Sequence, residues 1–153
     1  MSKTYKARNY ETLKADLIMG KKNEKKLLNY LNGLSENKNN QYQVFRNQYS
    51  TFDFVNTDTI AELKSRRCRC MKYHDTMVGL NKMQVCDKSH KDNVPEAEYK
   101  FYFLFTDGLY VWNYGDSKYQ VRPFFHKDKQ KYIDYAYIPV SALTLVCPNM
   151  NSF

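Results

Sequence analysis

The chain has 153 residues and a mass of 18.3 kDa, which is the size of one ordinary domain. Hydrophobic residues make up 42% and aromatic residues 16%, which is enough for a packed core and excludes a wholly disordered chain. The 24 Lys and Arg outnumber the 16 Asp and Glu, and the formal net charge of +8 favours a polyanionic partner such as nucleic acid.

The sequence also bears on cellular location. No window holds the roughly 18 uninterrupted apolar residues of a transmembrane helix, so we expect no membrane partner. Residues 1–10 are polar and lack the apolar region of a secretory signal. Four Cys without an export signal favour reduced thiols, so we expect an intracellular protein, in a host cell or virion if the chain is viral.

Residues 1–9 are expected to form a flexible basic arm, and residues 10–153 a single nuclease-like domain for the reasons given below. Residues 10–34 predict a helix, within which Gly20 is expected to produce a bend. Its apolar face is predicted from the three- to four-residue spacing of Leu13, Leu17, Gly20, Glu24, Leu28 and Leu31. Residues 35–41 are polar and predict a loop.

Short strands are expected next. Residues 42–45, 52–55 and 60–64 are rich in aromatic or β-branched side chains and are separated by polar turns. Residues 74–87 are ambiguous and favour a helix, with Met77, Leu80 and Val85 pointing inward. Residues 88–98 are polar, contain Pro95 and predict a surface loop.

A hairpin is predicted where residues 99–105 and 109–114 flank Thr106-Asp107-Gly108, because Gly108 can adopt the positive φ of a tight turn. Its aromatic run, residues 99–103, is expected in the core rather than as a base-stacking platform. Residues 119–122 are expected to extend the sheet and residues 132–138 to form a strand, before a last turn that begins at Pro139. The basic loop around His126 and Lys127 either contacts a nucleic-acid backbone or is simply solvated.

Asp53, Glu62 and Lys64 form the constellation that carries chemistry. Glu62 and Lys64 are two residues apart in a predicted strand and therefore share a face, and Asp53 joins them if its strand is the neighbour. Two carboxylates among apolar residues repel each other unless a cation lies between them, and oxygen ligands suit Mg²⁺ or Mn²⁺. The carbonyl of Leu63 is a further candidate ligand. The alternative is a surface strand with a cross-strand ion pair.

Such an arrangement suits the hydrolysis of a phosphodiester. A divalent ion on Asp53 and Glu62 would polarise the phosphodiester and lower the pKa of a bound water. Lys64 would orient that water or stabilise the negative charge that develops on phosphorus.

Asp53, followed after eight residues by Glu62-Leu63-Lys64, resembles the signature of the PD-(D/E)xK nuclease superfamily, with Phe52 where the family name has Pro. The family core is a helix, a meander of three strands that bears the acid and the ExK, a second helix and a further strand. The element order predicted above matches it over most of the chain. The resemblance implies an α/β, single-domain, restriction-endonuclease-like core, with a central mixed β-sheet flanked by helices.

The resemblance also implies the activity. The expected function is a Mg²⁺-dependent (or Mn²⁺-dependent) nuclease that hydrolyses phosphodiester bonds in DNA, with nonspecific or structure-selective cutting. The small size and the Lys-, Asn- and Tyr-rich composition resemble nucleases encoded by viruses or phages, including junction-resolving ones. Many compact nucleases of this kind dimerise, which allows a homodimer here. The alternative is a catalytically inactive nucleic-acid-binding or virion-associated protein with the same fold.

Other family features extend the site. Many members place a Glu on the first helix, which matches Glu24 as a further catalytic and metal-binding residue; the alternative is a Glu at the edge of the apolar face, paired with a neighbouring lysine. Arg66 shares a face with Glu62 and is expected to clamp a phosphate. Lys82, on the helix after the ExK, is expected near the site or, alternatively, exposed. Arg67 and Arg69 are further nucleic-acid-binding candidates, or solvated charges.

A competing hypothesis is a structural zinc site. Four Zn²⁺-compatible side chains lie close together in the sequence, and they are Cys68, Cys70, His74 and Cys86. The usual pair of Cys-x2-Cys knuckles is absent, and cysteine is commonly buried for packing alone.

Overall fold

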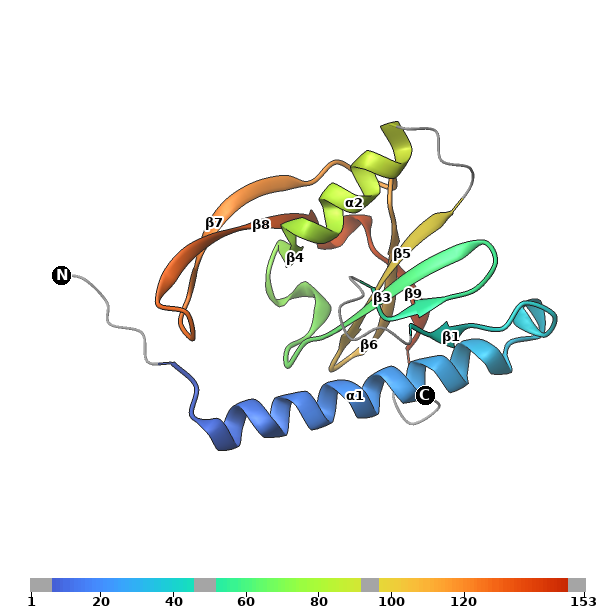
Figure 1. Ribbon diagram of the computed structural model, residues 1–153, viewed down its shortest axis with the longest axis horizontal. Helices are drawn as coiled ribbons and strands as arrows, with labels where there is room; N and C mark the ends of the chain where they lie inside the picture. The colour runs from blue at the N-terminus through green and yellow to red at the C-terminus, as the bar shows by residue number, and fades with distance from the viewer. Residues whose placement is uncertain (1–6, 46–51, 92–96, 149–153) are drawn as a thin grey trace.

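The main sheet of the computed structural model has six strands in the order β1-β2-β3-β5-β6-β9, within the described residues 7–45, 52–91 and 97–148 (Figure 1). These strands are β1 (Gln43–Val44), β2 (Phe54–Val55), β3 (Thr59–Ser65), β5 (Glu98–Phe105), β6 (Gly108–Asn113) and β9 (Thr144–Cys147). β3 and β5 are parallel, whereas the other neighbouring pairs are antiparallel. The protein is therefore mixed α/β with a mixed central sheet, as the sequence predicts.

Alternation along β5 divides the core into two layers. Phe101 and Phe103 pack on one face with side chains of α2 (Leu80–Lys91). Tyr102 and Leu104 pack on the other face with Leu27 of α1 (Tyr10–Gly33). Figure 1 shows α1 running below the main sheet and α2 lying above it. Full burial of each large side chain stabilises the fold by roughly 1.5–3 kcal/mol, so both helices are needed to complete the core.

α1 confirms the predicted helix, and it begins at a cap, because the side chain of Asn9 accepts a hydrogen bond from the Thr12 N–H at 2.8 Å. Gly20 does not interrupt it. The predicted apolar face is only partly correct: Leu31 is buried and Leu28 partly buried, whereas Leu17 is exposed. Leu27, which the predicted face does not include, is fully buried. The second half of α1 therefore attaches the helix to the sheet.

The segment 74–87 differs from its prediction. It begins as a strand, β4 (Asp75–Gly79), and only then becomes α2. Thr76 and Val78 alternate with more exposed neighbours, and β4 pairs with β8 (Lys131–Pro139). A β-branched alternation of five residues is too short to distinguish from a helix turn by sequence alone, and pairing with a distant strand decides its structure.

A second, three-stranded sheet has the order β4-β8-β7. Its edge strand β7 (Gln120–His126) contains residues 120–122, so the prediction that residues 119–122 extend the main sheet is wrong. The predicted final turn continues into β9, which pairs with β6. Figure 1 shows the β7–β8 hairpin curving away from the main sheet toward the beginning of α1.

The connections agree largely with the sequence. Gly108 has φ +154°, and a Cβ there would lie 3.0 Å from the backbone oxygen of Cys147, which explains the glycine in the β5–β6 turn. The loop at 35–41 contains a short 3-10 helix, Ser35–Asn37. Part of the predicted loop at 88–98 is helical, because α2 continues to Lys91, and residues 92–96 lie outside the described part of the chain.

The predicted basic arm is described only from residue 7. Arg8 forms ion pairs with Asp16 and Asp128, both at 2.7 Å, so this part of the arm is held against the domain. In the described chain, neither long helix is apolar enough to cross a membrane.

Candidate active site

The β2–β3 hairpin brings Asp53 beside the strand that carries Glu62 and Lys64. Phe54 pairs with Ala61, and the Asp53 N–H donates to the Ala61 carbonyl at 3.0 Å. The Asp53 carboxylate accepts a hydrogen bond from the Leu63 N–H at 2.8 Å. The carboxyl group of Asp53 is therefore anchored between the ExK residues, where the spacing of the sequence predicts it.

Glu62 is a buried carboxylate with two lysines on one of its oxygens. Its side chain is 3% exposed, and Oε1 lies 3.0 Å from Nζ of Lys64 and 3.4 Å from Nζ of Lys82. Oε2 is buried without a hydrogen-bond partner. Burial raises the pKa of Glu62. The charges of Lys64 and Lys82 lower this pKa, whereas the charge of Asp53 raises it, and the net shift is upward.

Lys82 reaches this group from α2, on the opposite side of β3 from α1. Its side chain is 14% exposed, and its Nζ lies 5.5 Å from the ring centroid of Phe52. Lys64 is more open, at 33%. Lys82 is thus placed at the site, as the resemblance implies, and the alternative of an exposed helix lysine is wrong.

Glu24 adds a third carboxyl group from α1. Burial, followed by the charges of Asp53 and Glu62, raises the pKa of Glu24 to about 7, while Lys21 lowers it. Hydrogen bonding with Asp53 adds a smaller upward contribution to the pKa of Glu24. Three acids, from α1, from β3 and from the residue just before β2, therefore act on one another, and one of them titrates near neutral pH.

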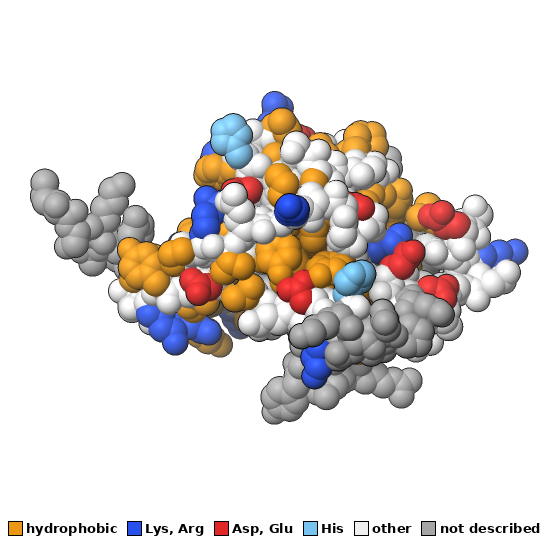
Figure 2. All heavy atoms as spheres, turned by 90° about the horizontal axis from the view of Figure 1, so that it is seen from above, with side chains coloured by type: hydrophobic (Ala, Val, Ile, Leu, Met, Phe, Trp, Pro, Cys, Tyr) orange, Lys and Arg blue, Asp and Glu red, His pale blue; other side chains and the backbone are white. Residues whose placement is uncertain are grey.

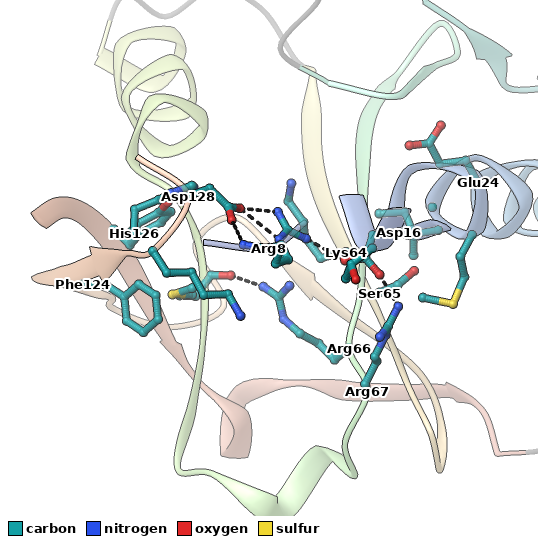
Figure 3. A pocket seen from close by; sticks show the side chains of 17 residues that line it. Arg8, Asp16, Glu24, Lys64, Ser65, Arg66, Arg67, Phe124, His126 and Asp128 are labelled. Atoms are coloured by element: carbon teal, nitrogen blue, oxygen red, sulfur yellow. Dashed lines mark hydrogen bonds and ion pairs between the residues drawn. The ribbon is translucent and has the colours of Figure 1, made fainter. Parts of the chain in front are cut away.

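An open cleft of about 680 Å³ starts at Glu24 and Lys64 (Figure 3). The opposite wall comes from the β7–β8 hairpin and includes Phe124, His126 and Lys127. Asp53, Glu62 and Lys82 do not line the cleft. The cleft therefore reaches the carboxylate cluster, which consists of Glu24, Asp53 and Glu62, through Glu24 and Lys64.

The predicted arginines lie in different surroundings. Arg66 lines the cleft, but its guanidinium donates to Thr76 Oγ1 at 3.2 Å and to the Met77 carbonyl, which joins the end of β3 to β4. Burial lowers the pKa of Arg66. Arg67 pairs with Asp16, whereas Arg69 is exposed outside the cleft. A phosphate contact by Arg66 stays a prediction, and its observed bonds are structural.

Sequence reasoning did not identify Arg8, Asp16 and Asp128 at the cleft. Arg8 donates to Asp128 from its backbone N–H and from Nε and Nη2, at 2.8, 2.9 and 2.7 Å. These bonds raise the pKa of Arg8 and lower that of Asp128. The two residues are 120 positions apart, and no local pattern points to such a contact.

The basic excess is not gathered into one patch on the face seen from above. Figure 2 shows Lys and Arg side chains there scattered among acidic and hydrophobic ones. At the cleft, by contrast, Arg8, Arg66, Arg67 and Lys127 line the walls together with Lys64. The cleft therefore brings five basic side chains together, alongside Asp16, Glu24 and Asp128.

The metal hypotheses can be compared on donor chemistry. In the described part of the chain, no three His, Cys, Asp or Glu side chains are grouped, as they stand, to hold a metal ion. The zinc hypothesis therefore finds no support: Cys70 and Cys86 are buried and His74 is exposed. The carboxylates do suit a hard cation, because Glu62 Oε2 is an unsatisfied buried acceptor beside Asp53 and Glu24. Binding by all three requires at least one side chain to turn.

The arrangement can act on a phosphate in two ways. The ammonium group of Lys64, which lines the cleft and is held by Glu62, can stabilise negative charge. Glu24, with its pKa of about 7, can exchange a proton near neutral pH.

No protein-family model, curated protein or solved structure matches this chain.

Proposed function

We propose that the protein is a metal-dependent nuclease that hydrolyses DNA phosphodiester bonds in a nonspecific or structure-selective way. The observation that carries the proposal is Glu62, buried at 3% exposure between two lysines, with an unsatisfied oxygen beside two further acids. Burying an ionised carboxyl group costs free energy, and here three acids interact at the end of a cleft.

The chain order of elements supports a restriction-endonuclease-like core. α1 is followed by three consecutive antiparallel strands, and α2 then leads to β5, parallel to β3. The same order holds in the superfamily that the Asp53–Glu62–Lys64 signature resembles. β4, inserted between β3 and α2, and its partners β7 and β8, which follow β6, are additional to that core.

Asp53, Glu62, Glu24 and the carbonyl of Leu63 would hold the Mg²⁺ or Mn²⁺. The ion, when bound, supplies Lewis acidity toward the phosphodiester and lowers the pKa of water. Lys64, which lines the cleft, orients the phosphate and offsets its charge. Lys82 lies behind Glu62, outside the cleft, and holds that carboxylate in place.

A noncatalytic nucleic-acid-binding protein is the second candidate, and one observation favours it. Glu62 already has two lysine partners, which neutralise it without a metal ion. Buried carboxylates in proteins are commonly paired with cationic side chains in this way. This candidate predicts binding that weakens with salt and no cleavage.

The test is cleavage of plasmid and short branched DNA in Mg²⁺, Mn²⁺ or EDTA. We expect cleavage with a divalent ion, reduced roughly 10²–10⁴-fold in Glu62→Gln and Lys64→Ala. Glu98→Gln and Lys88→Ala, which alter exposed residues of β5 and α2, serve as matched controls and should cleave normally. Salt-sensitive binding without cleavage in either ion would reject the nuclease in favour of the binding protein.

A further inference from the structure

The outer part of the cleft lies away from Glu24 and is built from two opposed walls. One wall is the beginning of α1 and the end of β3, with Arg8, Asp16 and Arg67. The other is the β7–β8 hairpin, with Phe124, Lys127 and Tyr135. Figure 3 shows Phe124 on one side of the cleft, and Asp16 and Arg67 on the other. Each wall therefore presents cationic side chains to the cleft, and each also carries an aspartate, Asp16 on the first wall and Asp128 on the second.

The cleft is bordered where the walls meet. Three hydrogen bonds from Arg8 to Asp128 tie the start of α1 to the β7–β8 turn. Arg8 and Arg67 both pair with Asp16 as well. The ties between Arg8 and Asp128 join the two walls of the cleft.

The size of the cleft agrees with a thin ligand. Its volume of about 680 Å³ falls in the range of small-ligand pockets, about 300–1,000 Å³. This is room for a few nucleotides of one strand. A duplex carries a second strand beside every nucleotide, and we expect it to lie across the mouth of the cleft rather than inside it.

Phe124 supplies a surface for a base. It lines the cleft although its side chain is 45% exposed. Tyr135 meets it edge to face, with ring centroids 6.0 Å apart and an interplanar angle of 87°, which fixes its orientation. An exposed aromatic ring beside cations is the arrangement by which proteins hold single strands, because every base has a π-face to stack on it.

We propose that the outer part of the cleft binds a single nucleic-acid strand, with a base stacked on Phe124 and phosphates held by Lys127 and Arg67. This inference deepens the proposed function. It rests on that function for the cleavage step, because the bound strand would lead from this site to the carboxylates of Glu24, Asp53 and Glu62. The substrate class is therefore single-stranded nucleic acid, or the unpaired arm of a branched molecule.

The experiment measures binding in EDTA, so that cleavage does not enter. Fluorescence anisotropy compares labelled oligo-dT, oligo-rU and a blunt duplex of equal length. We expect a single strand to bind more tightly than the duplex, and the tighter of the two oligonucleotides identifies the sugar. Phe124→Ala and Phe124→Leu should bind the single strand roughly 5- to 100-fold more weakly, whereas Phe124→Tyr should retain affinity.

Matched controls lie on the same hairpin. Tyr132→Ala removes an aromatic side chain that is 72% exposed outside the cleft and should have no effect. Lys127→Ala should weaken binding and lower its salt dependence, whereas Lys129→Ala, outside the cleft, should not. Equal affinity for duplex and single strand, or wild-type binding by Phe124→Ala, would overturn the inference. Selective binding without cleavage in Mg²⁺ would reject the nuclease and keep the strand site.

Discussion

Replacing Glu24 with Gln should stabilise the protein at pH 8 and leave its stability nearly unchanged at pH 4. Burial and the charges of Asp53 and Glu62 raise the pKa of Glu24 from 4.5 to about 7. The folded state thus binds the proton more tightly than the unfolded chain does. The free energy of unfolding therefore falls as pH rises from 4.5 to about 7. Gln cannot ionise, so the variant lacks this loss.

The size of the effect follows from the shift. The difference between 4.5 and about 7 corresponds to about 3 kcal/mol, at about 1.4 kcal/mol per pH unit. Glu24 is only partly buried, so solvent screening reduces this to roughly 1–2 kcal/mol. The Gln amide can still donate to Asp53, as the protonated acid does, so little is lost in its place.

Urea unfolding followed by circular dichroism, in EDTA at pH 4, 6 and 8, measures the effect. The difference between variant and wild type should grow with pH. Glu11→Gln, an exposed substitution in the first turn of the same helix, should leave stability unchanged or lower it slightly at pH 8. A Glu24→Gln variant that is equally destabilised at every pH would refute the reasoning, because it would make Glu24 an ordinary structural group.

Three further changes probe the framework. Gly108→Ala should lower the free energy of unfolding by about 1–3 kcal/mol, because Gly108 has φ +154° and the backbone of β9 is close to it. Gly33→Ala, with open space around it, should not lower this free energy, and urea titration compares the two variants. Phe101→Ala, at a fully buried position, should cost about 3–5 kcal/mol, against little for exposed Val121→Ala, by the same measurement. Arg66→Ala should remove two bonds to β4 and speed hydrogen exchange in β4 more than in β5; equal exchange in the two strands would contradict this role.

Local periodicity was sufficient for the centre of the candidate site. A strand of period two places Glu62 and Lys64 on one face, and the short β2–β3 connection brings Asp53 beside them. Glu24 and Lys82 were predicted through the resemblance, and both lie near Glu62. The type of element, helix or strand, was also predicted correctly for α1, β5 and β6, where long apolar patterns agree with the final packing.

Long-range pairing explains what the sequence did not predict. Residues 75–79 form a strand because β8, more than fifty residues later, offers a partner. The outer wall of the cleft depends on that same sheet and on the contact between Arg8 and Asp128. Neither has a local signature, since ion pairs at such separations follow from the fold and do not produce a repeating pattern.

Proton release provides a last test of the carboxylate cluster. Three acids and two lysines leave one net negative charge when all are ionised, and Glu24, with its pKa of about 7, can be neutralised by a proton instead. A divalent ion held by Glu24, Asp53 and Glu62 must displace that proton. Mg²⁺ binding at pH 6 should therefore release about one proton in the wild type and fewer in Glu24→Gln, and it should strengthen as pH rises toward 8. Calorimetry in buffers of different ionisation enthalpy measures this release. Binding without proton release, or no binding at all, would mean that the two lysines already satisfy the cluster, as expected of a protein that only binds nucleic acid.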